Sequence, residues 1–296
     1  QDLEDGATKT KHIQLDSTAQ REQFTLQPFD YVFVPQAKDA QQIKTVDISG
    51  EVRFPGTYRI KDGEQISDLI RRAGGFTEQA YFFGAKFTSP KAQKIQQQSV
   101  DQLVRELEVR TYQQMSEQTQ TAISEEEATL AQQTKSNLQG FIDKLDNLEV
   151  EGRVAITMAN LETFSDSRYD FELDDGDTLN IPKRPNFVAV TGSVYSPSAY
   201  LYQPGQTAAD YLDKAGGATK TADEDYMYIL RANGEVISKQ QGGTFANPFA
   251  STELMPGDTV VVPENLDRVP YLRLVRDVSD IVFKIATTAG VALSLM

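Results

Sequence analysis

"VDISGEVRFPGTYRIKDGEQISDLIRRAGGFT" at residues 46–77 is repeated as "VAVTGSVYSPSAYLYQPGQTAADYLDKAGGAT" at residues 188–219. The two stretches align without a gap at a constant offset of 142 positions (188 − 46). Such repetition predicts that one supersecondary unit is built twice. The residues that define the repeat are Gly50, Pro55, Tyr58, Gly74 and Gly75 in the first copy, and Gly192, Pro197, Tyr200, Gly216 and Gly217 in the second.

Each copy predicts two strands followed by a helix. Apolar residues alternate from Val46 to Val52, which is typical of a strand. The sequence Phe-Pro-Gly at 54–56 then predicts a turn, and residues 57–60 predict a returning strand. Apolar residues follow at helical spacing from Ile66 to Ala73, and the paired glycines indicate where that helix ends.

A second pattern occurs three times, as LQPFDYVFVP (26–35), LDDGDTLNIP (173–182) and LMPGDTVVVP (254–263). Each predicts a turn that carries Asp30, Asp177 or Asp258, then an apolar strand that a proline ends. The apolar stretch RVAITMANL (153–161) predicts one more strand before the second of these turns. The unit of two strands and a helix occurs twice, whereas this closing pattern occurs three times. We therefore interpret residues 1–36 as the end of a module that begins further upstream.

These motifs resemble the SLBB module, a small β-grasp fold named for soluble-ligand binding. The resemblance is carried by G-x-V-x-x-P-G/S-x-Y, by the AGG-x-T helix end and by the closing L-x-x-G-D-x-x-x-V/I-P. Tandem SLBB modules before a C-terminal helix are similar to the outer-membrane polysaccharide export family of Wza-like and KpsD-like proteins. Two departures are Phe29 in place of the usual glycine and the lack of a lipobox cysteine or N-terminal export domain.

The predicted fold is therefore α+β, with tandem β-grasp modules and a C-terminal amphipathic transmembrane helix. The expected domains are the C-terminal part of a preceding SLBB module (1–36), an SLBB module (46–184) with a helical insertion (91–149), a second SLBB module (186–265) and a membrane helix (270–296).

The insertion is rich in Gln, Glu and Thr and predicts a helical hairpin. Apolar residues are spaced as on a helix from Val100 to Leu107 and again from Leu138 to Leu148. Between them, Ser124 and the three glutamates after it form a typical helix start. Two interpretations stay open, a solvated spacer and a docking arm for a neighbouring subunit or a second export component.

The final stretch, residues 277–296, would span about 30 Å as a helix, close to one hydrocarbon thickness. A narrow polar stripe interrupts an otherwise apolar surface, which is the reverse of a soluble surface helix. The predicted pore-lining residues on this stripe are Asp277, Asp280, Lys284, Thr287 and Ser294, and the predicted membrane-boundary residues are Arg273 and Arg276.

Three arrangements of this helix compete. A lone membrane anchor would expose charged side chains to lipid at a high free-energy cost. A helix buried in the protein's own core is the plainest alternative. In a ring of such helices, polar stripes would face a central pore while apolar faces would meet lipid and neighbouring helices. We expect the ring.

Composition argues against several classes of protein. The formal net charge of −14 disfavours nucleic-acid binding. There is no cysteine and a single histidine, His12, so we expect no metal site, cofactor or catalytic residues. The acidic clusters SEEEA, ELDDGD and TADEDY (124–128, 172–177 and 221–226) fall where turns and helix starts favour acids. A polysaccharide hydrolase is therefore the least favoured hypothesis.

The resemblance implies a non-enzymatic homo-oligomeric ring in the outer membrane with periplasmic domains. Such a translocon would export a capsular or extracellular polysaccharide through its lumen, together with an inner-membrane polysaccharide co-polymerase or export partner. The competing hypothesis is a soluble periplasmic carbohydrate-binding adaptor that packs its last helix on its own core.

Overall fold

The computed structural model describes residues 43–119, 125–165, 167–239, 248–266, 272 and 278–290. The described residues belong to one compact unit, Ile43–Met296. The expected module remnant at 1–36 lies outside the described residues.

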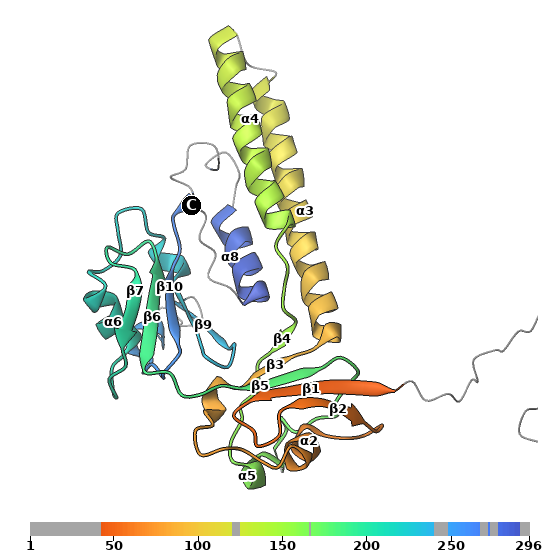
Figure 1. Ribbon diagram of the computed structural model, residues 1–296. Helices are drawn as coiled ribbons and strands as arrows, with labels where there is room; N and C mark the ends of the chain where they lie inside the picture. Colours follow the sequence, from red (N-terminus) through yellow and green to blue (C-terminus); the bar gives the residue numbers. More distant parts are fainter. Residues whose placement is uncertain are drawn as a thin grey trace, which may run out of the picture. The chain divides into compact units, whose positions relative to one another are not determined.

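The first module is a mixed five-stranded sheet in the order β2-β1-β5-β3-β4 with short helices (Figure 1). Strands β1 and β2 form an antiparallel hairpin, and β5 returns parallel to β1. The elements are β1 (Lys44–Gly50), β2 (Gly56–Ile60), α2 (Ile66–Arg72), η1 (Phe82–Gly84), β3 (Lys86–Thr88), β4 (Arg153–Val154), α5 (Leu161–Ser165) and β5 (Thr178–Ile181).

The second module repeats this topology in the order β7-β6-β10-β8-β9. Its elements are β6 (Phe187–Gly192), β7 (Ser198–Leu201), α6 (Ala208–Lys214), η2 (Glu224–Tyr226), β8 (Tyr228–Leu230), β9 (Val236–Ser238), α7 (Pro248–Ser251) and β10 (Thr259–Val262). Each module buries its own apolar cluster beneath its sheet. Two mixed sheets with helices agree with the α+β fold that the repeat predicts.

The repeat-defining glycines at 50 and 192 lie where two backbones almost touch. Gly50 has φ +82° and Gly192 has φ +90°, and a Cβ atom on either would collide with the carbonyl oxygen of Ile181 or Val262. The residue after each glycine donates its backbone N–H to that same carbonyl at 2.7 Å. Only glycine fits such a crossing of the first and last strands.

The other shared residues hold the turn that follows. The Tyr58 hydroxyl donates to the Phe54 carbonyl at 2.6 Å, and the Tyr200 hydroxyl donates to the Ser196 carbonyl at 2.6 Å. The second glycine of each pair donates back into the helix, Gly75 to the Ile70 carbonyl, which is the hydrogen bond that ends a helix with a left-handed residue. The repeated residues therefore fix the backbone at the strand crossing, at the turn and at the end of the helix.

The helical insertion splits the β3–β4 hairpin of the first module. Helices α3 (Pro90–Thr119) and α4 (Glu125–Asp146) run side by side, as Figure 1 shows. Beyond Val154 the predicted strand at 153–161 is wrong, because β3 has only three residues with which to pair. Ile156 and Met158 keep their alternating burial without strand pairing, and α5 begins at Leu161.

Helix α8 (Val278–Ala289) lies beside α3 (Figure 1). Its buried residues are Val278, Ile281, Val282, Ile285, Ala286 and Ala289. Most of them join one apolar cluster with residues of α3 and α4, including Val104, Leu107 and Leu138. Among the helices in the described ranges, none has both the length and the apolar content needed to cross a bilayer.

Candidate functional site

The two closing aspartates are structural. Asp177 accepts a hydrogen bond from the backbone N–H of Asp174 at 2.8 Å, and Asp258 accepts one from Met255 at 2.8 Å. Burial raises the pKa of both carboxyl groups above the ordinary range of aspartate, against the lowering effect of these N–H donors. Asp258 also forms an ion pair with Arg231 at 2.9 Å. Both carboxyl groups hold the turn before the last strand of their module.

Two more acids of ELDDGD, Asp174 and Asp175, also have structural partners. Asp174 forms an ion pair with Lys91 at 2.5 Å, and Asp175 accepts from the Thr45 N–H at 2.7 Å. Among the described residues, no group of three His, Asp or Glu side chains is placed to hold a metal ion.

The structure places three of the five predicted pore-lining residues on α8. Lys284 donates to Asp280 at 2.6 Å, so the two charges pair along one helix face. Thr287 donates to the backbone carbonyl of Phe283 at 2.9 Å. The other two pore-lining residues and both predicted boundary residues, Asp277, Ser294, Arg273 and Arg276, lie outside the described residues.

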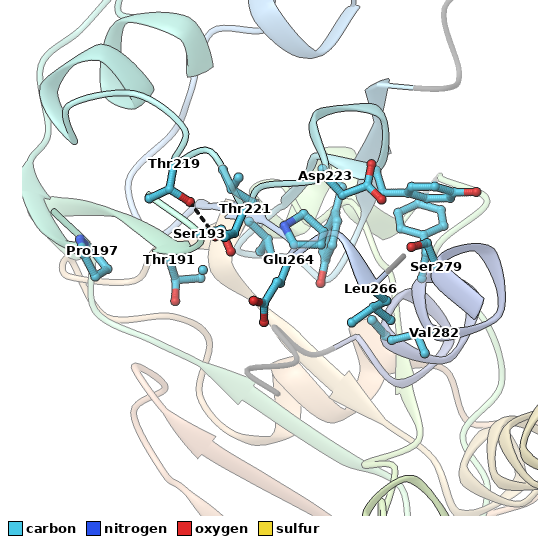
Figure 2. Close-up of a pocket in the computed structure, with 18 residues that line it drawn as sticks. Thr191, Ser193, Pro197, Thr219, Thr221, Asp223, Glu264, Leu266, Ser279 and Val282 are labelled. Carbon is cyan, nitrogen blue, oxygen red and sulfur yellow. Dashed lines mark hydrogen bonds between the residues drawn. The ribbon is translucent and has the colours of Figure 1, made fainter. Parts of the chain in front are cut away.

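A pocket of about 330 Å³ lies between the second module and α8 (Figure 2). Helix η2, the end of β6, the end of β10 and the loop after α6 form the module side. The lining residues are Thr191, Gly192, Ser193, Pro197, Thr219, Thr221, Asp223, Tyr226, Tyr228, Val261, Val262, Pro263, Glu264, Leu266, Ser279, Val282, Phe283 and Ala286. Its volume is near the lower limit for small-molecule sites.

One end of the pocket is rich in hydroxyl groups. Figure 2 shows Thr191, Ser193, Thr219 and Thr221 gathered there, and the Thr219 and Thr221 hydroxyls lie 2.9 Å apart. The Glu264 side chain lies between this end and α8. Within the described ranges, no lysine or arginine forms an ion pair with Glu264.

The other end is apolar and aromatic. The Phe283 ring of α8 lies 5.3 Å from the Tyr226 ring and 5.6 Å from the Tyr228 ring, measured between centroids. Burial raises the pKa of Tyr228, so its phenol stays neutral. Ser279 lines the same end, and its buried hydroxyl has no hydrogen-bond partner among the described residues.

The sequence alone does not predict this pocket, although the repeated motifs border it. Gly192, Pro197 and the Thr219 of AGGAT belong to the repeat, and their place in the pocket follows from the sheet crossing. The missing information was the position of α8, which supplies the opposite wall. The sequence does contain one sign of a difference between the modules, because the position of Glu51 in the first copy is occupied by Ser193 in the second.

Comparison with known protein families identifies SLBB domains at residues 45–86 and 187–240. Both segments cover the hairpin and the helix of their module, and the second segment also contains β8 and β9. The repeat-based prediction of two SLBB modules is therefore confirmed.

Two curated Escherichia coli proteins, each named polysialic acid transport protein KpsD, are each 28% identical to this chain over 172 residues. The alignment covers 58% of this chain and 28% of each KpsD protein. The shared region is thus a minor part of those relatives. The two SLBB domains and this similarity support the resemblance to the Wza-like and KpsD-like polysaccharide export family.

Proposed function

We propose that this chain is a non-enzymatic component of a bacterial cell-envelope apparatus that exports a capsular or extracellular polysaccharide. The observation that carries the proposal is the pair of SLBB modules in a chain similar to a polysialic acid transport protein. Deleting the gene should remove polysaccharide from the cell surface, because the polysaccharide would lack its export route. Unchanged surface polysaccharide in the deletion strain would contradict the proposal.

In the more specific form, the chain is one subunit of a homo-oligomeric outer-membrane translocon. Periplasmic rings of SLBB modules would surround the polysaccharide, and an inner-membrane co-polymerase or export partner would deliver it. The C-terminal helices would form an α-barrel with the stripe of Asp277, Asp280, Lys284, Thr287 and Ser294 toward the lumen. Arg273 and Arg276 would lie at the membrane boundary, where long cationic side chains reach water. Support comes from the polar stripe on an otherwise apolar segment.

A second candidate is a soluble periplasmic adaptor that binds carbohydrate. The observation in its favour is the burial of α8 against α3 and α4 of its own chain. In this form the insertion is the cover of the last helix, and no lipid contact is needed. The translocon form requires α8 to leave that cover during assembly.

Purification of the full chain from detergent-solubilised membranes separates the two forms. A translocon subunit should co-purify with the outer membrane and give circularly symmetric particles by electron microscopy. An adaptor should appear in the periplasmic fraction as a small species by light scattering. Normal ring formation by a chain with substitutions that release α8 would support the translocon. A strictly monomeric, water-soluble full-length chain would exclude it.

A further inference from the structure

The two modules carry different side chains at equivalent positions next to the strand crossing. In the first module, Glu51 follows the crossing glycine and forms an ion pair with Lys183, with Oε1 and Nζ 3.6 Å apart. The Thr77 hydroxyl donates to the other oxygen of Glu51. The Glu51 side chain is only 15% exposed and the Lys183 side chain is 70% exposed, so the carboxylate fills this corner of the sheet while the ammonium lies at the surface.

The second module has neither residue of this ion pair at the equivalent positions. Ser193 occupies the place of Glu51, since both residues donate their N–H to the last strand after the crossing glycine. Glu264 occupies the place of Lys183, as the matching bridges Ala80 with Lys183 and Ala222 with Glu264 establish. A short hydroxyl thus replaces the carboxylate, and a carboxylate replaces the ammonium.

Ser193 is smaller than Glu51, and the two replacements change the chemistry of this place. Ser193 and Glu264 both line the 330 Å³ pocket, together with the hydroxyls of Thr219 and Thr221. Carboxylates and hydroxyls accept hydrogen bonds from the vicinal hydroxyls of a sugar. The aromatic end, formed by Tyr226 and Phe283, offers apolar surface for the C–H face of a sugar ring.

We propose that the second SLBB module binds a neutral saccharide unit in this pocket, between Ser193, Glu264 and α8. The inference rests on the proposed export function, in the form in which α8 stays docked on its own chain, because the saccharide would be a segment of the exported polysaccharide. Acidic sugars are disfavoured, since Asp223 and Glu264 line the pocket and no described lining residue is Lys or Arg. The pocket therefore selects against the chemistry of polysialic acid.

The first module supplies the variant that tests this. The double substitution S193E/E264K copies the Glu51 and Lys183 pair into the second module, where Thr219 matches Thr77. The variant should fold, because the first module folds with that pair, and its pocket should be closed. E264Q alone keeps the volume and removes the charged acceptor. D213N removes one exposed charge of the same module away from the pocket and is the matched control.

Binding is measured on the purified full chain by isothermal titration calorimetry and ligand-observed NMR. The probes are maltohexaose, cellohexaose, laminarihexaose and mannohexaose as neutral saccharides, with oligosialic acid and oligogalacturonate as acidic ones. We expect at least one neutral probe to bind to the wild type and to D213N. E264Q should bind about tenfold or more weakly, and S193E/E264K should not bind.

Three results would overturn the inference. They are preference for the acidic probes, no binding by any neutral probe, and unchanged binding by S193E/E264K with a native circular dichroism spectrum. None of these results decides the export function, which the deletion strain tests separately. Loss of export in that strain, together with absent binding, would reject the pocket and keep the export role.

Discussion

At the scale of single residues, the repeated glycines differ in what surrounds them. Gly192 and Gly217 have similar left-handed φ values, +90° and +82°, yet only Gly192 faces a backbone carbonyl. Gly217→Ala should therefore cost only the strain of a left-handed alanine, about 1–2 kcal/mol of unfolding free energy. Gly192→Ala should cost a further ~1–3 kcal/mol, because the new methyl group must displace β10. Urea unfolding of both variants measures the difference, and equal losses would show that the crossing relaxes freely.

The buried ion pair of Arg231 and Asp258 makes stability depend on pH. Burial raises the folded-state pKa of Asp258 above its unfolded value, so this carboxyl favours folding most when protonated. Its contribution falls as the pH rises from about 4 through the raised pKa. Replacing Arg231 with Met leaves the carboxylate unpaired and raises that pKa further. We expect a loss of about 3–5 kcal/mol at neutral pH, and a smaller loss near the acid end of this range.

Urea unfolding of Arg231→Met and of the wild type across that pH range tests whether the loss of unfolding free energy grows as the pH rises. Lys44→Ala is the control, since it removes a cation from an exposed ion pair with Asp62. Exposed pairs contribute little, so this variant should track the wild type at each pH. A loss in Arg231→Met that is independent of pH would mean that packing of the side chain, and not its charge, accounts for the effect.

At the scale of elements, local patterns in the sequence predicted most of what the structure contains. Alternation from Val46 to Val52 and helical spacing from Ile66 to Ala73 depend on neighbours along the chain, and the glycine pairs mark where helices end. The strand predicted at 153–161 failed after two residues, since pairing depends on the length of β3, which is far away in sequence. The docking of α8 on the insertion could not be predicted for the same reason.

The insertion and α8 should behave as one unit. Leu107 of α3 is fully buried in the cluster that contains Ile281 and Ile285 of α8. Leu107→Ala should therefore lower the unfolding free energy by about 2–5 kcal/mol. It should also speed amide hydrogen exchange in α8 more than in the first module. Val109→Ala is the control, because Val109 of the same helix is 54% exposed. Unchanged exchange in α8 would contradict the docking.

At the scale of the whole molecule, divergence between the copies matters more than their likeness. The repeat shows what both modules need for folding, namely the crossing glycines, the tyrosine lock and the closing aspartates. The pocket arises where one copy departs from that pattern, at Ser193 and Glu264, and where α8 supplies a wall. No local sequence motif marks such a site. It can be identified only when the positions of the strand crossing and of α8 are both known.

The absence of cysteine offers a direct test of where α8 lies in the assembled protein. Single cysteines at Lys284, whose side chain is 54% exposed, and at Ile285, which is fully buried, would each be unique in the chain. In the purified chain, a membrane-impermeant maleimide should label Lys284→Cys quickly and Ile285→Cys at least about tenfold more slowly, because α8 must first open.

The two forms of the proposed function then diverge in cells. For an adaptor, the same difference should persist in the periplasm. For a translocon, Lys284→Cys should stay reachable through the lumen, whereas Ile285→Cys should gain reactivity toward a lipid-soluble reagent, since its side chain would have exchanged α3 for neighbouring helices and lipid. Equal labelling of both cysteines in the purified chain would mean that α8 is not docked on the insertion, and the adaptor would lose the observation that favours it.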